Sequence, residues 1–343
     1  MSVPYGHGAL RSESASPSQP SATRVFEKTR QAGEVDLDYQ QMIDAETWAF
    51  IRKTAESYPD NATDLDIAGQ RGVYDAMCRV FHAPHPEGVG TEDLKAGDVP
   101  VRVYTAGDPT RTVVFFHGGG FVVGNLESHD DVCAELCALT GYRVVSVDYR
   151  LTPEHKHPAA FDDAWAATQW VSDTYEGGIV LAGDSAGGNL AASVAHHARG
   201  RLDGVLGQVL VYPGLGGDVD SGSYLEHANA PMLTRDEVLF YTALRYDGPV
   251  PEADVTSAPL HDTDFSGLPP TVLITADCDP VRDDSPAYRD RIIDAGGRAH
   301  WINEEGLIHG YLRARHEVER AKASFERISI AIEALGQGIW PYD

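Results

Sequence analysis

The sequence predicts an α/β fold, in which helices cover both faces of a mostly parallel central sheet and a helical cap is added. From about residue 99 onward, short apolar runs typical of buried strands alternate with helical patterns. A glycine-flanked serine separates one such run from the helical pattern that follows it. Two further helical patterns precede the first strand. The length of 343 residues suits one such domain with an insertion.

Composition excludes several classes of partner. The chain is 42% hydrophobic and 23% charged, which is typical of a globular protein, and its net charge is −25. So negative a surface argues against nucleic acid and anionic membranes as partners. It fits either a salty habitat or an ordinary acidic enzyme. No run approaches 18 apolar residues and no secretory signal is apparent, so we expect no membrane span and a cytoplasmic protein.

The four cysteines are few and scattered, which suits a reducing compartment. Cys133 and Cys137 lie one helical turn apart, a spacing that a metal site can use. No second pair of Cys or His follows at a suitable distance, so we interpret both as buried apolar thiols and expect no metal.

The N-terminal part divides into two segments. Residues 1–22 are rich in Ser, Pro and Gly and predict a mobile tail, and residues 23–95 predict a helical cap. Apolar residues recur at helical spacing over residues 39–51 and again over residues 67–81. The aromatics Trp48 and Phe50 either belong to the core or line a lid over the active site, and the pattern leaves both readings open.

Residues 96–343 predict the catalytic domain. Strands are expected at residues 99–104, 112–116, 143–147, 179–182, 208–211, 271–275 and 299–302. Helices are expected at residues 130–139, 161–171 and 286–295. The segment of about residues 214–260 breaks the alternation, because it is long and loop-rich with one good helix near residues 235–246. We interpret it as an insertion that completes the cap.

The motif Gly183-Asp-Ser-Ala-Gly187 follows the apolar run at residues 179–182 and precedes an alanine-rich stretch. Gly-x-Ser-x-Gly between a strand and a helix predicts a nucleophile elbow, a tight turn that exposes the hydroxyl of Ser185. Side chains two residues to either side of the serine would collide across such a bend, and glycine avoids this. The motif alone is weak, because it arises by chance in many chains.

Two further segments supply partners for the serine. The glycine run His117-Gly-Gly-Gly-Phe121 follows a strand, where exposed N–H groups can stabilise an oxyanion. His309 lies just after the last expected strand and suits a general base. Asp279 follows another strand and suits the carboxylate that orients the histidine, favoured by the proline after it. Three nearby aspartates compete for that role: Asp277, Asp283 and Asp284.

Together these segments resemble a known family. The motifs are HGGGF at residues 117–121, GDSAGGNL at 183–190, DPVRD at 279–283, IHGY at 308–311 and YRLTPEHKHPAA at 149–160. They are similar to those of the hormone-sensitive-lipase family of α/β hydrolases, the bacterial family IV esterases. The resemblance covers the chain from about residue 99 to the C-terminus, and the preceding helices resemble the family's cap more loosely.

The resemblance implies an esterase of short acyl chains that needs neither cofactor nor metal. Ser185 would be the nucleophile, His309 the base and Asp279 its orienting carboxylate. The backbone N–H groups of the oxyanion hole would come from Gly118, Gly119 and Ala186. Candidate substrate contacts are Trp48, Phe50, Phe121 and Asp184. A homodimer formed through the sheet edge near residues 299–302 is left open.

Two alternatives share this scaffold. Amides or lactones could be hydrolysed at the same site, and the sequence separates these substrates poorly from esters. A non-catalytic ligand receptor on the same fold is disfavoured, because such relatives have lost the catalytic histidine and His309 is present.

Overall fold

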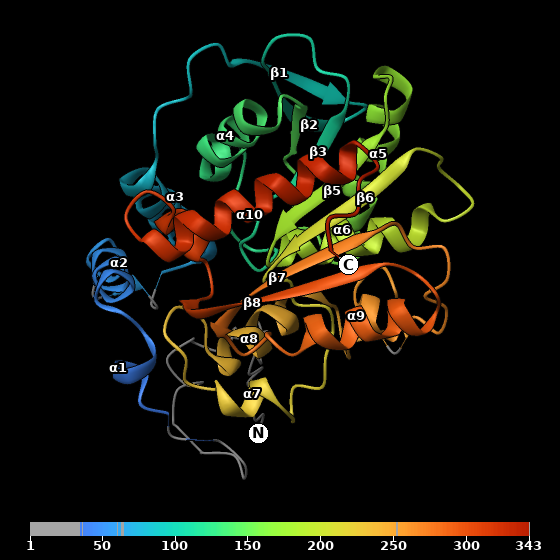
Figure 1. Cartoon of the computed structure of the whole chain (residues 1–343). Coiled ribbons are helices and arrows are strands. Elements are labelled where there is room, and N and C mark those ends of the chain that lie inside the picture. Colours follow the sequence, from blue (N-terminus) through green and yellow to red (C-terminus); the bar gives the residue numbers. More distant parts are fainter. Residues whose placement is uncertain (1–34, 36, 60, 63–64, 252, 343) are drawn as a thin grey trace, which may run out of the picture.

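The computed structural model describes residue 35 and residues 37–59, 61–62, 65–251 and 253–342. The expected tail at residues 1–22 and the start of the expected cap lie outside these residues. An eight-stranded sheet with the order β1-β2-β4-β3-β5-β6-β7-β8 runs through the centre of the molecule (Figure 1). Strands β3 to β8 are parallel, whereas β2 runs antiparallel to both β1 and β4. The structure thus confirms the α/β class.

The strands are β1 (Gly90–Ala96), β2 (Val99–Thr105), β3 (Thr112–Phe116), β4 (Arg143–Val147), β5 (Ile179–Asp184), β6 (Val205–Val211), β7 (Thr271–Cys278) and β8 (Ala299–Ile308). The sequence analysis did not name β1, which begins the sheet inside the segment expected to be cap. Strand β8 lies at the far edge, so the edge proposed for dimerisation is an edge strand. The dimer itself stays a prediction.

Alternate residues of the central strands build two separate cores. Val113 and Phe115 of β3 face one core, whereas Val114 and Phe116 face the other. All five residues of β3 are buried, because helices cover both sides of the sheet. This explains why the central strands are continuous apolar runs in the sequence.

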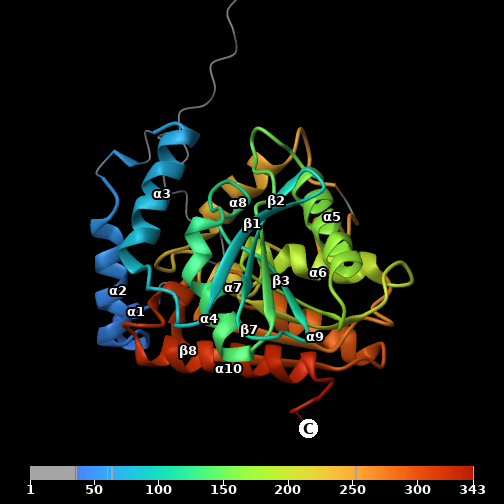
Figure 2. The same cartoon turned by 90° about the horizontal axis from the view of Figure 1, so that it is seen from above.

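Among the described residues, two helices cover one face and three cover the other. Leu136 of α4 (Asp130–Thr140) and Ile328 of α10 (Glu319–Gly336) belong to the first core. Residues of α5 (Ala159–Thr174), α6 (Ala186–Ala198) and α9 (Asp284–Asp294) belong to the second. Figures 1 and 2 show α10 lying along one side of the strands, with α5 and α6 on the opposite side.

The three N-terminal helices, which the sequence analysis expected to form a cap, lie beside the sheet at one end of the molecule in both views (Figures 1 and 2). They are α1 (Tyr39–Met42), α2 (Ala45–Glu56) and α3 (Ile67–Phe81). The pattern at residues 39–51 is divided between α1 and α2, because Asp44 caps α2 by accepting a hydrogen bond from the Thr47 N–H at 2.8 Å. Phe50 and Phe81 join the α4 and α10 core, so α2, α3 and the sheet share one apolar cluster.

The expected insertion contributes two helices, α7 (Ser223–Glu226) and α8 (Arg235–Arg245). Helix α8 begins with a capping box, in which Thr234 and Glu237 each bind the backbone N–H of the other. Short 3₁₀ turns complete the fold at Glu127–His129, Pro259–His261 and Tyr311–Ala314. Whether α1 to α3 and this insertion form one functional cap stays a prediction.

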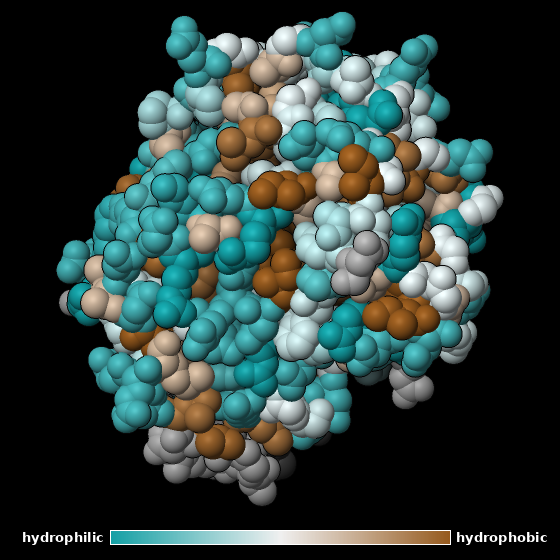
Figure 3. Space-filling view, in the orientation of Figure 1, coloured by the Kyte–Doolittle hydropathy of each residue, from teal (hydrophilic) through white to brown (hydrophobic). Residues whose placement is uncertain are grey.

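The face shown in Figure 3 is mostly hydrophilic, with apolar residues scattered across it. Such a surface agrees with the strongly negative net charge. Within the described ranges, no helix combines the length and the apolar character needed to cross a bilayer. All four cysteines are buried and unpaired, which matches their interpretation as apolar thiols.

Candidate active site

Ser185 occupies the sharp turn between β5 and α6. Its φ of 55° and ψ of −117° place it outside the conformations that a side chain ordinarily allows. The turn is held by the Ser185 N–H, which donates to the Val211 carbonyl at 2.9 Å, and by the Asn189 N–H, which donates to the Ser185 carbonyl at 3.1 Å. The hydroxyl is thereby directed away from the sheet at the N-terminal end of a helix.

Both glycines of the motif are required by close contacts of the backbone. A Cβ atom at Gly187 would lie 1.9 Å from the Phe116 carbonyl oxygen, and one at Gly183 would lie 2.5 Å from the carbonyl of Gly187. These obstacles are backbone atoms at the end of β3 and in the turn itself, so no side-chain movement relieves them. The collision across the bend that the sequence predicted is therefore confirmed for Gly183, whereas Gly187 is required by its contact with the end of β3.

We expect Gly187→Ala to lower the free energy of unfolding by about 3 kcal/mol or more, the upper range for overpacking. The reason is the clash of the added methyl group with the Phe116 carbonyl. Denaturant unfolding monitored by circular dichroism measures the change. Gly72→Ala is the matched control, because Gly72 is exposed in α3 and a Cβ there meets nothing within 4 Å. The control should be neutral or gain up to about 1 kcal/mol. Equal stability of the two variants would refute the steric account.

His309 and Asp279 meet the serine in one line of hydrogen bonds. Nε2 of His309 lies 2.8 Å from Oγ of Ser185, and Nδ1 lies 2.6 Å from Oδ2 of Asp279. Strand β8 ends at Ile308 and β7 ends at Cys278, so each side chain follows the carboxyl end of a parallel strand. Asp279 is fully buried, and its Oδ1 accepts a hydrogen bond from the Val281 N–H at 3.0 Å.

The three competing aspartates are engaged elsewhere. Asp277 accepts from the Asn303 side chain at 2.8 Å and from the Gly306 N–H at 3.3 Å. Asp283 accepts from the Ser223 N–H at 2.9 Å. Asp284 accepts from the Leu215 N–H at 2.6 Å, and burial raises the pKa of its carboxyl to about 6. The structure therefore brings Asp279, and not its neighbours, to the histidine.

The glycine run corrects one expectation about the oxyanion hole. The N–H of Gly118 donates to Oδ1 of Asp184 at 2.8 Å, and Gly118 is buried. This donor is already used inside the protein, so assigning Gly118 to the oxyanion hole is wrong. Gly119 and Gly120 are partly exposed, and in the described part of the chain their N–H groups have no acceptor. Ala186 opens helix α6, where the first N–H groups lack partners within the helix.

Asp184 holds this loop in place. Besides the Gly118 N–H, its carboxylate lies 3.2 Å from the Tyr212 hydroxyl and 3.2 Å from Nε2 of His129. Burial alone would raise its pKa, but His129 and the Gly118 N–H outweigh burial and bring the pKa to about 2. Asp184 was expected to contact substrate. The residue is 3% exposed and its side chain is bound within the protein, so it is a positioning residue.

His117 also supports the loop. Its ring stacks on the Tyr149 ring at 4.3 Å between centroids, and the Tyr149 hydroxyl donates to the His117 carbonyl at 2.7 Å. Burial is the main cause that lowers the pKa of His117, to about 3. The imidazole is therefore neutral near pH 7 and adds no charge near the serine.

The expected aromatic contacts lie in different places. Phe50 is 1% exposed, and its ring packs on Phe81 at 5.0 Å, which favours the core reading for this residue. Trp48 is partly buried and packs against the same core. Phe121 has a positive φ of 64°, and the Arg245 guanidinium lies 3.7 Å from its ring centroid. Of the three, Phe121 is the one in the glycine-rich loop.

Sequence reasoning missed two aromatic residues beside the site. The ring of Tyr212, just after β6, lies 4.8 Å from the His309 ring. Tyr241 of α8 lies against the loop, because a Cβ atom at Gly120 would come within 2.8 Å of its ring. The sequence showed aromatics in the insertion but held no signal for which of them faces the glycine run.

Comparisons with known proteins identify the family and the fold. Residues 113–313 match a protein family whose description is alpha/beta hydrolase fold. The carboxylesterase NlhH of Mycobacterium tuberculosis is 40% identical over 230 residues, which are 63% of this chain and 72% of that protein. The ethyl acetate hydrolase of Pseudomonas putida is 28% identical over 315 residues, covering 87% of this chain and 96% of the relative.

A solved structure is similar over most of its length. The hyperthermophilic esterase from the archaeon Pyrobaculum calidifontis matches with a TM-score of 0.78 and 34% identity, covering 86% of this chain and 99% of that one. The family match spans more than half of the chain. The resemblance expected from the motifs is confirmed: the chain belongs to the hormone-sensitive-lipase family of the α/β-hydrolase fold.

Proposed function

We propose that the protein hydrolyses carboxylic esters of short acyl chains through an acyl-enzyme intermediate on Ser185. The observation that carries the proposal is the line of hydrogen bonds from Ser185 through His309 to Asp279 at a strained strand-to-helix turn. The names of the relatives, a carboxylesterase and an ethyl acetate hydrolase, point to the same chemistry.

The first half of the reaction forms the acyl-enzyme. The carboxylate of Asp279 accepts the Nδ1–H of His309, which leaves Nε2 as the lone-pair nitrogen facing Ser185. Nε2 removes the hydroxyl proton as Oγ attacks the ester carbonyl. When the tetrahedral intermediate collapses, the C–O bond to the leaving alcohol breaks and His309 returns the proton to that oxygen.

The second half releases the acid. Water attacks the acyl carbonyl while Nε2 of His309 takes its proton, and the bond to Oγ breaks as Ser185 regains a proton. In both halves the negative charge on the carbonyl oxygen faces the N–H groups of Gly119, Gly120 and Ala186. Donors preorganised for that charge supply a large share of the rate enhancement, because they need not rearrange during the reaction.

A receptor function fits the geometry less well. A binding protein needs no general base, yet His309 lies 2.8 Å from the serine hydroxyl and is itself held by a buried carboxylate. The arrangement costs a strained backbone at Ser185, and such strain persists where it serves function. Esters, amides and lactones share the tetrahedral intermediate, so the choice between them rests on measured turnover.

The proposal is tested by turnover of p-nitrophenyl esters from acetate to palmitate, with an amide and a lactone alongside. We expect kcat/KM to be highest for the acetate and butyrate and to fall for longer chains. Because Tyr241 lies on the loop at Gly120, Tyr241→Ala should move the preference toward longer chains. Phe240→Ala, at the adjacent position of α8, is the control. A preference for the palmitate or for the amide would reject the short-chain ester assignment.

A further inference from the structure

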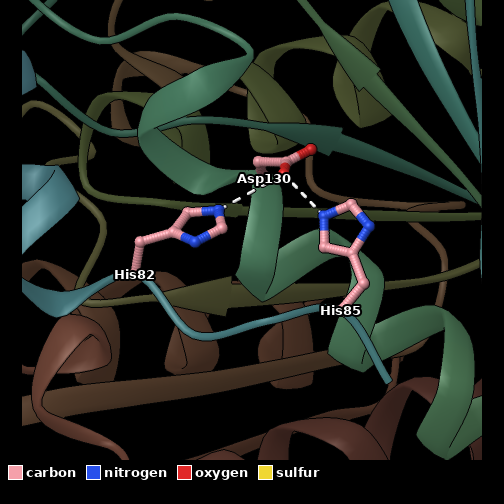
Figure 4. A group of neighbouring side chains, drawn as sticks. All are labelled: His82, His85 and Asp130. Carbon is pink, nitrogen blue, oxygen red and sulfur yellow. Dashed lines mark hydrogen bonds and ion pairs between the residues drawn. The ribbon is translucent and has the colours of Figure 1, made fainter. Parts of the chain in front are cut away.

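Outside the active site, two histidines and an aspartate gather where the cap meets the catalytic domain (Figure 4). His82 directly follows α3, His85 lies three residues later in the loop, and Asp130 opens α4. Nε2 of His82 is 3.3 Å from Oδ2 of Asp130, and Nε2 of His85 is 2.6 Å from the same oxygen. All three ligand atoms lie within 4.8 Å of one another.

The aspartate is held so that one oxygen faces the imidazoles. Its Oδ1 accepts hydrogen bonds from the Tyr104 hydroxyl at 2.7 Å and from the Arg102 guanidinium at 3.0 Å. Within the described ranges, the two histidines are the only partners of Oδ2. Partners that fix the far side of a ligand in this way are a regular feature of metal sites, because they set the orientation of the ligating atom.

The surroundings suit a cation that enters from solvent. The side chains of His82 and His85 are 34% and 29% exposed, whereas that of Asp130 is 9% exposed. Arg102, the cation nearest to Asp130, also pairs with Asp93 and Glu127, so three carboxylates surround one guanidinium. A cavity of about 270 Å³ adjoins His82 and is lined by Asp75, Arg79, Glu127 and Ser128. Of the three proposed ligands, His82 lines this cavity, and Arg79 adds one positive charge to its wall.

We propose that His82, His85 and Asp130 bind one Zn²⁺ ion per chain, with water filling the remaining positions. Two imidazoles and a carboxylate match the ligand preferences of zinc, whereas calcium and magnesium prefer oxygen ligands alone. The ion would replace the hydrogen bonds to Oδ2, and the 2.6 Å contact would lengthen as both atoms turn toward the metal. A purely hydrogen-bonded His–Asp–His group is the competing explanation.

The site joins two parts of the chain that are distant in sequence. The two histidines belong to the segment that leaves the cap, and Asp130 belongs to the helix that covers the sheet. An ion there would fasten the end of α3 to α4 and would stabilise the folded chain only, because the unfolded chain does not hold the ligands together. The sequence analysis expected no metal, since it considered the cysteines and not these histidines.

Calorimetric titration of Zn²⁺ into the full chain, without a polyhistidine tag and after treatment with chelator, tests the proposal. We expect one saturable site and a zinc-dependent rise in the midpoint of thermal unfolding. His82→Gln and His85→Gln should each weaken zinc binding at least about tenfold and abolish the thermal shift. Co²⁺ bound to the wild-type chain should give the visible absorption of a low-coordinate site, a readout that needs no variant.

His316→Gln is the matched control, because His316 also pairs with a carboxylate, Glu135 at 2.8 Å, but no second histidine among the described residues joins that pair. Its zinc affinity should equal that of the wild type. The proposal is overturned if the wild-type chain shows no saturable binding. It is equally overturned if the double variant His82→Gln, His85→Gln keeps the stoichiometry and affinity of the wild type. Esterase activity is not part of the readout, so this test and that of the proposed function fail independently.

Discussion

Replacing Ser185 with alanine is expected to lower kcat for p-nitrophenyl butyrate by about 10⁴-fold to 10⁶-fold. The substitution removes the oxygen that lies 2.8 Å from Nε2 of His309 and leaves only water as a nucleophile. The residual rate would come from the oxyanion donors and from substrate binding. KM should change little, because the hydroxyl contributes to the reaction and not to the shape of the pocket. Initial rates at saturating substrate measure the effect.

Ser193→Ala serves as the matched control. Ser193 is a fully buried serine of α6, and its hydroxyl has no partner among the described residues. Removing that hydroxyl should leave kcat within about twofold of the wild type, because no hydrogen bond is lost with it. Both variants should retain the circular dichroism spectrum of the wild type. If Ser185→Ala keeps more than a tenth of the wild-type kcat, Ser185 is not the nucleophile.

Replacing Asp279 with asparagine is expected to lower kcat by about 10⁴-fold. Oδ2 of Asp279 lies 2.6 Å from Nδ1 of His309, and an amide there stabilises the wrong tautomer and cannot balance the charge of the imidazolium. An unchanged circular dichroism spectrum of the variant separates this effect from a general loss of folded protein.

Asp277→Asn is the control for this experiment, because Asp277 lies two residues before Asp279, at the carboxyl end of strand β7 itself. Its carboxylate contacts Asn303 and Gly306, and no hydrogen bond joins it to His309. We expect kcat to stay within a few-fold of the wild type. A loss for Asp277→Asn as large as that for Asp279→Asn would contradict the assignment of the orienting carboxylate.

The central sheet was predictable because strands that are buried on both faces are continuous apolar runs in the sequence. Strands such as β3 and β5 are uninterrupted apolar runs, and both are wholly buried. Strand β1 escaped prediction because it lies at the edge of the sheet. Five of its seven residues are exposed, and its only buried residue is the last. Its Gly-Thr-Glu-Asp-Leu-Lys-Ala sequence has neither alternation nor an apolar run.

The positions of Ser185, Asp279 and His309 were predictable because each follows a strand of the same parallel sheet, and such strands end at one edge. The oxyanion donors were harder to assign. Three glycines in a row indicate that the backbone closely approaches a neighbouring group. They do not indicate which N–H groups face the oxyanion and which bond within the protein. The answer depends on Asp184, 66 positions from Gly118 in the chain, whose carboxylate takes the first of the three donors. The spacing of residues in the sequence does not predict that hydrogen bond.

The substrate contacts were least predictable, because they too depend on contacts between residues that are distant in the sequence. Trp48 and Phe50 share the helix α2, yet Phe50 is 1% exposed and Trp48 is only partly buried. Tyr241 belongs to α8, which begins more than a hundred residues after the glycine run. Its contact at Gly120 therefore depends on how the insertion packs against that run. Long-range contacts of this kind follow from the packing of whole elements.

Mass spectrometry after reaction with an organophosphate ester tests the central claim most directly. The phosphoryl group replaces the proton of the nucleophilic oxygen, and loss of the leaving group makes the adduct stable enough for peptide mapping. We predict one adduct per chain, located on the peptide that contains Ser185, together with complete loss of esterase activity and no adduct in the Ser185→Ala variant. Inactivation with the adduct on another residue, or full activity in the phosphorylated chain, would contradict the account.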